Sequence, residues 1–502
     1  MSQPQSAAPP LDIASADPRR WVALAILLLA SFMNLMDVTI VNVALPSLQR
    51  NLGADSTHIE WVIAAYVLAF ALGLLPFGRL GDIVGRKTMF LLGVTAFTIA
   101  SALCGLAPNI ETLIGARAFQ GLGAAMMTPQ VLAIAQVTFP PQERGQAFSL
   151  FGLSSGLASV CGPILGGLLI DANIAGLDWR PIFLVNIPFG ILAVVAGWFL
   201  IRSVPGNRTL RNDYVGIGIF GLSILLLIYP IIEGRSFGWP AWSFAMMAAA
   251  IAGLVIFVGW ERRRARIGQP QLLNFDLLTS RNYMLGVAIM TIYASGIPGM
   301  FMVISLLFQG AFGLTPLESG LTNTPFSVGV LVISFVAGRL GSNHLKARMM
   351  VAALMLICGM TWLHFIMAGL VDSIDRLAFM APLFIAGMGL GLGFSSIFQA
   401  VLSGVPHRDA GSASGALQAF QQVGGALGVA LVGQIFFSNL EGAMATGVAP
   451  HPAYAGAAAT AMFYQIGSFT LVLVLAFFLK IARPQQQHGT RASQPAPVAV
   501  EV

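Results

Sequence analysis

An aspartate lies in the middle of a long apolar segment near the start of the chain. Asp37 stands between Asn34 and Asn42 within residues 21–43, a stretch that spans about 34 Å as a helix and so matches the hydrocarbon core of a bilayer. An ionised carboxylate at mid-membrane costs roughly 2.5–3.5 kcal/mol, so such groups are kept mainly where they face a wet cavity or carry protons. The alternative is a carboxylate that only hydrogen-bonds within a helix bundle.

A permanent positive charge lies in another apolar segment. Arg117, Gln120, Ala124 and Thr128 follow one another at spacings of three and four, so they share one face of a helix. A guanidinium buried among apolar helices must aim at carbonyls, water or a carboxylate, which makes Arg117 a candidate electrostatic partner for a titrating acid. The alternative is a purely structural tether for a neighbouring helix.

Composition identifies the class of protein that positions these residues. Hydrophobic residues make up 57% of the 502 residues and charged residues only 9%, with a mean hydropathy of +0.81. Too little polar surface remains for a water-soluble fold, and the long apolar stretches differ from the short alternating segments of an outer-membrane barrel. We therefore predict an all-α integral membrane protein.

The sequence contains no pattern typical of an enzyme or a metal site. The three cysteines lack metal-like spacing, and no catalytic cluster or phosphate-binding loop occurs. We therefore expect no enzyme, no metal and no cofactor.

Hydropathy and helix-breaking residues predict fourteen membrane spans. They are placed at residues 21–43, 58–78, 88–107, 110–137, 145–171, 181–202, 213–233, 243–260, 281–309, 318–340, 347–369, 377–402, 412–437 and 459–481. We expect two six-helix bundles joined by a linker with one extra pair of helices, flanked by disordered cytoplasmic ends. The corresponding ranges are 1–18 (disordered), 19–204 (first bundle), 205–270 (linker), 271–483 (second bundle) and 484–502 (disordered).

The distribution of basic residues predicts the orientation. If the N-terminus is cytoplasmic, most of the 26 Lys and Arg fall on the inner side, while Arg50, Arg180, Arg235 and Arg376 fall outside. This obeys the positive-inside rule and puts both termini in the cytoplasm of a multi-pass protein of the cell inner membrane. The net charge of +6 then describes loops facing anionic lipid of the bilayer, not a nucleic-acid surface.

The loop after the second span carries a motif. Residues 78–87 read Gly-Arg-Leu-Gly-Asp-Ile-Val-Gly-Arg-Lys, and residues 338–342 repeat its start as Gly-Arg-Leu-Gly-Ser. This resembles the loop signature of the major facilitator superfamily and implies its fold, with cargo bound between two six-helix halves. The glycines allow a tight turn, Asp82 can accept from backbone N–H groups at a helix start, and Arg86 and Lys87 can pair across the bundle or with lipid. The motif residues expected to act in gating are Gly78, Gly81, Asp82, Gly85, Arg86 and Lys87.

Further stretches resemble the fourteen-span drug:proton antiporter branch of that superfamily, the EmrB/QacA type. They are residues 36–46 around Asp37, residues 117–125 from Arg117, residues 162–167 with Gly156 upstream, and residues 179–190. The resemblance implies that Asp37 and Arg117 couple transport to protons and that the glycine-rich fifth span belongs to an exporter. Small residues and a proline let helices pack closely and bend, which suits moving halves. The expected residues are Gly156, Gly162, Pro163, Gly166 and Gly167.

Neutral polar and adaptable side chains mark a candidate cargo site. Met and aromatic residues could line a permissive pocket, and glutamines could bond to varied cargo, although most such Met and Phe residues face lipid or neighbouring helices. The candidate substrate-binding residues are Asn34, Asp37, Asn42, Tyr66, Gln120, Tyr293, Met300, Phe301, Gln418 and Gln422. Near the outer face, Glu233 is expected to pair with Arg235, Trp61 to anchor at the interface, and Glu60 to sit at a helix start.

These observations predict a proton-coupled multidrug efflux antiporter that exports amphipathic, often cationic, small molecules by alternating access. Asp37 would take a proton from outside and release it to the cytoplasm, with proton and cargo excluding one another. A proton-coupled exporter of a lipid or endogenous metabolite is the alternative, and an uptake symporter is a weaker one. The sequence does not identify a periplasmic adaptor protein.

Overall fold

The computed structural model describes residues 18–203, 205–207, 211–272, 275–340, 344–405 and 410–480, and every regular element in these ranges is helical. Residues 1–17 and 481–502, which contain most of both predicted disordered ends, lie outside the described residues, as do Gly341 and Ser342 of the repeated motif.

The helices follow one another with short connections. The first group is α1 (Arg20–Leu52), α2 (Ser56–Val84), α3 (Arg86–Gly105), α4 (Ile110–Thr138), α5 (Pro141–Asp171), η2 (Ile174–Gly176), α6 (Pro181–Leu184) and α7 (Asn186–Leu200). The next pair is α8 (Tyr214–Glu233) and α9 (Ala241–Arg266). The last group is α10 (Phe275–Thr279), α11 (Arg281–Ser295), α12 (Pro298–Ser305), the π-helical η3 (Leu306–Ala311), α13 (Pro316–Leu340), α14 (Leu345–Ala368), η4 (Arg376–Phe379), α15 (Met380–Leu402), α16 (Ala410–Ala445) and α17 (Pro450–Phe478).

The predicted fold class and span number are confirmed. Among the described residues, thirteen helical segments are long and apolar enough to cross a membrane, and α5 supplies a further apolar stretch at Gly156–Asp171. Each of the fourteen predicted spans falls on one of these segments.

Two predicted spans are broken by proline. The ring of a proline inside a helix clashes with the carbonyl four residues earlier. Pro188 therefore disturbs the turn at Leu184, where α6 ends and α7 follows. Likewise α11 ends at Ser295, and α12 begins at Pro298. The first break places Asn186 at the start of α7, in the interior of the molecule.

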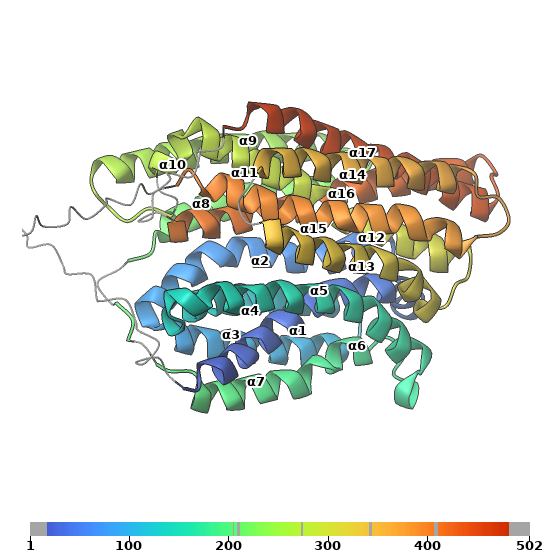
Figure 1. Ribbon diagram of the computed structural model, residues 1–502. Helices are drawn as coiled ribbons and strands as arrows, with labels where there is room; N and C mark the ends of the chain where they lie inside the picture. The colour runs from blue at the N-terminus through green and yellow to red at the C-terminus, as the bar shows by residue number, and fades with distance from the viewer. Residues whose placement is uncertain are drawn as a thin grey trace, which may run out of the picture.

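The helices gather in two groups around a lengthwise seam (Figure 1). Helices α1–α7 lie on one side, and α11–α17 lie on the other together with α8 and α9. We call the end of the molecule where α1 begins the near end and the end where α1 finishes the far end. Across the seam, α5 packs against α13 and α2 packs against α16, while α8 packs mainly on α9 and also touches α2 and α16.

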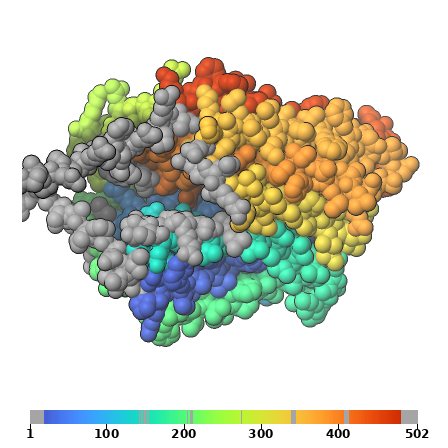
Figure 2. Space-filling model, in the orientation of Figure 1, coloured from blue at the N-terminus to red at the C-terminus, as the bar shows by residue number. Residues whose placement is uncertain are grey.

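Hydrogen bonds cross the seam from its middle to the far end. Ser327 Oγ of α13 donates to Ser159 O of α5 at 2.7 Å, and Gln309 Nε2 of η3 donates to Val43 O of α1 at 2.9 Å. In the space-filling view the α5 segment abuts the α13 segment directly (Figure 2). The two groups of helices are therefore closed against each other at the far end.

Candidate functional site

Asp37 and Arg117 meet inside the first group of helices. Arg117 Nη1 of α4 lies 2.5 Å from Asp37 Oδ2 of α1, and the two side chains are 2% and 0% exposed. Arg117 Nε also donates to Val62 O of α2 at 3.2 Å, and the guanidinium lies over the ring of Tyr66, 4.2 Å from its centroid. Each charge thus has its opposite at contact distance, which a buried ion needs.

The second carboxylate oxygen of Asp37 accepts two amide hydrogen bonds. Gln120 Nε2 donates to Asp37 Oδ1 at 2.8 Å, and Asn186 Nδ2 of α7 donates to it at 3.1 Å. Both amides also donate to Ser101 Oγ of α3 at 3.0 Å, and Ser101 donates to Phe183 O at 3.1 Å. The hydroxyl uses its one proton and both lone pairs, so four helices hold the carboxylate in a fixed cage.

A second polar group adjoins the cage. Tyr66 donates to Asn34 Oδ1, and Asn34 Nδ2 lies 3.5 Å from Thr128 Oγ1 of α4. Tyr66 therefore connects the Arg117 guanidinium to Asn34. Tyr66 is fully buried, so its ring lies inside the first group of helices and not in an open pocket.

The carboxylate of Asp37 does not face an open route. It points toward α3, α4 and α7 of its own group, whereas the neighbouring Thr39 and Ile40 face the glycines of α5. This corrects the expectation of a wet cavity around Asp37. Polar side chains of the surrounding helices replace water as its hydrogen-bond partners.

The glycines of α5 serve two interfaces. A Cβ at Gly162 would overlap Thr39, and one at Gly166 would come within 2.8 Å of Ile40, so these two positions let α1 approach α5. At the other two expected glycine positions, an added side chain would collide with the second group of helices across the seam. There, Gly156 faces Leu331 and Gly167 faces Leu317, both of α13, while Pro163 O lies against Gly320.

The turn of the loop motif makes several contacts within the first group. Gly85 has φ of 107°, which L side chains rarely adopt, and it forms the predicted tight turn between α2 and α3. Asp82 accepts from Arg86 Nε at 3.0 Å instead of from helix N–H groups, which corrects that expectation. Arg86 Nη1 donates to Ala133 O of α4 at 3.0 Å, and Lys87 Nζ donates to Trp198 O of α7 at 2.6 Å.

The other two glycines of the motif differ in their surroundings. A Cβ at Gly81 would overlap Gln130 of α4, whereas Gly78 has room, since its nearest neighbour, Pro129, is 3.6 Å away. A larger residue at position 81 would therefore have to displace the end of the Gln130 side chain, whereas one at position 78 would not displace a neighbour.

An ion pair at the near end ties α1 to α5. Arg20 Nε lies 2.7 Å from Glu143 Oε2, and Nη2 donates to Oε1 at 2.9 Å. These hydrogen bonds lower the pKa of the Glu143 carboxyl below its ordinary value, because they favour the charged form. The carboxylate therefore stays ionised at neutral pH, and the pair would be lost only as the pH falls through that lowered value.

The remaining candidate cargo residues are not brought to Asp37. Gln418 and Gln422 of α16 are half-buried and share a helix face with Gly415 and Gly425, which lie against α2. Asn42 donates to Val38 O of its own helix at 3.1 Å.

The three candidates from the ninth predicted span also have other neighbours. Tyr293 donates to Gly389 O and Leu390 O of α15 at 2.9 and 2.8 Å. Met300 is fully buried, and Phe301 packs edge to face on Phe326 with ring centroids 4.9 Å apart. The structure thus assembles Asn34, Asp37, Tyr66, Arg117 and Gln120, but not these other residues.

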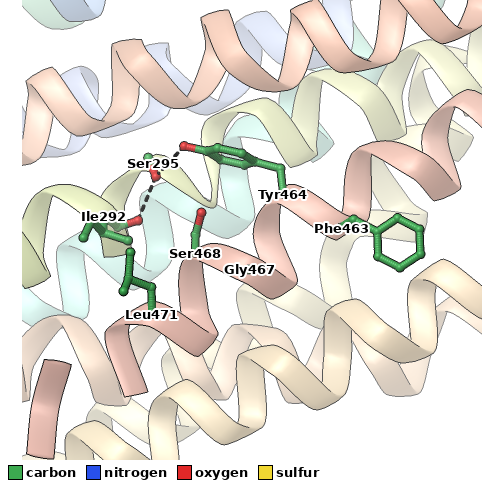
Figure 3. A pocket seen from close by; sticks show the side chains of 7 residues that line it. All are labelled: Ile292, Ser295, Phe463, Tyr464, Gly467, Ser468 and Leu471. Carbon is green, nitrogen blue, oxygen red and sulfur yellow. Dashed lines mark hydrogen bonds between the residues drawn. The ribbon is translucent and has the colours of Figure 1, made fainter. Parts of the chain in front are cut away.

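A separate shallow groove lies between α11 and α17 (Figure 3). It has a volume of about 370 Å³ and is lined by Ile292, Ser295, Phe463, Tyr464, Gly467, Ser468 and Leu471. Tyr464 donates to Ser295 Oγ at 2.9 Å, so these hydroxyls are already paired. None of the candidate cargo residues lines the groove, and Phe463 at its edge is exposed.

Sequence reasoning missed Ser101 and Asn186. Asn186 lies in the stretch at residues 179–190 that resembles the antiporter branch, yet it received no role. The available signal was an amide two residues before Pro188, inside an apolar segment, where an unpaired polar group is costly.

Comparison with known proteins identifies the family. The family model described as "Major Facilitator Superfamily" matches residues 27–429. The chain is 38% identical to the "Probable actinorhodin transporter" of Streptomyces coelicolor, over 85% of this chain and 74% of that one. It is 30% identical to the "Puromycin resistance protein pur8" of Streptomyces alboniger, over 99% of both chains, and 28% identical to the "Probable multidrug resistance protein EmrY" of Escherichia coli, over 82% and 79%.

Solved structures agree on the fold. A bacterial homologue of the human lysosomal transporter Spinster, in an inward-facing and occupied conformation, aligns with a TM-score of 0.63 at 16% identity, over 92% of this chain and 97% of that one. At this identity the likeness concerns the fold alone. The family model and the relatives together show that the chain belongs to the major facilitator superfamily, in its drug:proton antiporter branch.

Proposed function

We propose that the protein is a proton-coupled efflux antiporter that moves amphipathic, often cationic, small molecules across the cell inner membrane by alternating access. The observation that carries this proposal is the buried Asp37–Arg117 pair in a chain whose relatives are named for drug resistance and export. A carboxylate and a guanidinium enclosed at mid-membrane are energetically costly, and binding and release of a proton by the acid is a function that would explain their presence.

The proposed coupling runs through the helices and not through a shared pocket. Protonation of Asp37 removes its charge and weakens the hold on Arg117, which is then free to bond elsewhere. Asn186 Oδ1 has no hydrogen-bond partner among the described residues, so rotation of this amide offers a protonated Asp37 an acceptor. Because the cage joins α1, α3, α4 and α7, a change of charge there alters how these helices pack. Helix α1 also packs on Gly162 and Gly166 of α5, the helix whose other face lies on the seam.

The two bundles predicted at residues 19–204 and 271–483 are the proposed moving units. In this proposal the near end faces the cytoplasm, as the basic residues predict, and the far end faces outward. The cargo route lies along the seam between α2, α5, α13 and α16, where Gln418 and Gln422 adjoin α2. Proton and cargo then act on different surfaces of the first bundle.

The decisive experiment is Asp37→Asn in proteoliposomes with an imposed proton gradient and a panel of fluorescent cationic compounds. We expect gradient-driven export to be lost while the purified protein keeps its elution profile. Its unfolding temperature should fall, because Arg117 stays buried without its counter-ion. Asp372→Asn, at an exposed position between α14 and η4, is the matched control and should export normally. Full gradient-driven export by the Asp37 variant would refute the proposal.

Export of an endogenous metabolite is the second candidate. It is favoured by the 38% identical relative, whose name specifies transport of one compound, actinorhodin. Inside-out vesicles supplied with single compounds in the surrounding medium separate the candidates. A multidrug exporter accumulates several unrelated compounds, a dedicated exporter accumulates one class, and an uptake symporter accumulates none in this orientation.

A further inference from the structure

The connection between α8 and α9 joins both groups of helices at the far end. Arg235 in this connection is only 8% exposed. Its Nη1 lies 2.5 Å from Glu441 Oε1 of α16, and its Nη2 lies 3.4 Å from Glu60 Oε1 of α2. This corrects the prediction that Arg235 pairs with Glu233, because Glu233 instead accepts from Trp61 Nε1 at 2.8 Å.

The connection is fastened more firmly to α2 than to α16. Besides the Trp61 bond, Arg235 Nη2 donates to Ser56 Oγ at 2.7 Å, and the hydroxyls of Thr57 and Ser236 are 2.7 Å apart. Toward α16 there is the pair with Glu441, which is 61% exposed, and the ring of Phe437, whose centroid is 4.9 Å from the guanidinium. When α2 and α16 separate, the bonds to α16 are therefore the ones that break.

Glu60 is buried because α16 covers it. The expectation that Glu60 lies at the surface of a helix start is wrong, since its side chain is 1% exposed. Gly433 of α16 presses on the carboxyl group: a Cβ built there would lie 2.5 Å from Glu60 Cδ. Glu60 Oε2 has no hydrogen-bond partner among the described residues. An ionised oxygen without a donor is costly in a buried position, and separation of α16 would admit water to it.

From this geometry, and resting on the proposed antiport function, we propose that Glu60 is a second proton-binding carboxylate of the transport cycle. A proton from water at the far end forms the O–H bond at Oε2 as the two groups of helices come together. The neutral acid is then enclosed when Gly433 returns. On reopening, the proton leaves to water, and the anion keeps Arg235 as its counter-ion. The extra helix pair thus supplies the positive charge that this site needs.

The charged surroundings suit such a site. The charged groups acting on Glu60 in the described structure are Arg235 and Glu233 from the α8–α9 connection, Glu441 from α16, and Asp55 at the start of α2. Asp55 is itself paired with His58 Nδ1 at 2.8 Å. One guanidinium therefore faces several carboxylates, and a proton on Glu60 relieves their mutual repulsion.

The first test detects the protonated carboxyl group directly and needs no cargo. Infrared difference spectra of purified protein between about pH 5 and about pH 8 should contain a protonated-carboxyl C=O band that is lost in Glu60→Gln. Glu441→Gln, which alters only the exposed partner, should retain the band. Because this proton is taken from and returned to water at the far end, it does not change the number of protons moved per cargo molecule. In proteoliposomes with ethidium as the probe, Glu60→Gln should instead remove the dependence of the export rate on the pH at the far end between about pH 5 and about pH 8. An unchanged band and an unchanged dependence on far-end pH would overturn the proposal.

A second variant covers the case in which Glu60→Gln does not fold. Gly433→Ala leaves the carboxyl group in place but removes the space that encloses it, so the C=O band should shift in frequency or lose intensity. A band identical to that of the unaltered protein would contradict the inference. These outcomes are separable from those for Asp37: failure of the antiport proposal appears as undiminished export by the Asp37 variant, whatever Glu60 does.

Discussion

At the residue scale, the cage around Asp37 distributes a buried charge over several helices. A buried ion pair gives little net stability, but the loss of one partner is costly because the other charge remains buried. Here Gln120, Asn186 and Ser101 add neutral hydrogen bonds to the Asp37–Arg117 pair. Their removal should therefore weaken the cage without leaving a bare charge.

Replacement of Asn186 by leucine tests this reasoning. The change keeps the number and branching of the side-chain heavy atoms but removes a donor from both Asp37 Oδ1 and Ser101 Oγ. We expect a loss of about 1–3 kcal/mol in the free energy of unfolding, the usual cost of leaving buried polar groups unsatisfied. Thermal unfolding in detergent measures it. Asn439→Leu is the control, since Asn439 is exposed and donates to a carbonyl of its own helix, and an equal loss there would contradict the role of Asn186.

At the element scale, the two faces of α5 contact different helices and have different roles. Gly162 and Gly166 let α1 approach within one group of helices, whereas Gly156 and Gly167 lie on the seam against α13. From the sequence, these glycines form a single glycine-rich helix with no sign of which helix each one contacts. The structure separates positions that hold a bundle together from positions where two bundles meet, and only the second kind must move in alternating access.

Alanine at Gly162 should therefore act on folding. The added Cβ overlaps Thr39, and since Met36 O is also within 3.2 Å, the collision cannot be relieved by side-chain rotation alone. We expect a loss of about 1–3 kcal/mol, the usual cost of overpacking. Gly115→Ala in α4, where nothing lies within 4 Å of the added carbon, should be neutral or slightly stabilising. Equal unfolding temperatures for the two variants would show that α1 and α5 are not tightly packed.

At the scale of the whole molecule, the sequence predicted the number of spans and the meeting of Asp37 with Arg117. Both follow from local rules: apolar length sets the spans, and a charge in a membrane needs its opposite. The break at Pro188 was readable in principle, but its effect on Asn186 depends on where the interrupted helix then packs. The contacts of Glu60, Arg235 and Glu441 join residues far apart in sequence. In the sequence alone each of these charged residues is typical of a surface loop or a helix end, so only the assembled helices show that they meet.

The closed seam gives a prediction about the molecule as a whole. Ser159 of α5 and Ser327 of α13 are in contact across the seam, and alternating access requires this contact to open. With Cys104, Cys161 and Cys358 replaced by serine, cysteines at positions 159 and 327 should be joined by a short thiol crosslinker. Crosslinking should then stop export, and a cleavable linker should restore it on reduction. The same crosslinker on cysteines in place of Arg20 and Glu143, whose side chains pair inside one group of helices, should leave export largely intact. Export that continues at full rate with positions 159 and 327 joined would mean that the two groups of helices do not separate along α5 and α13.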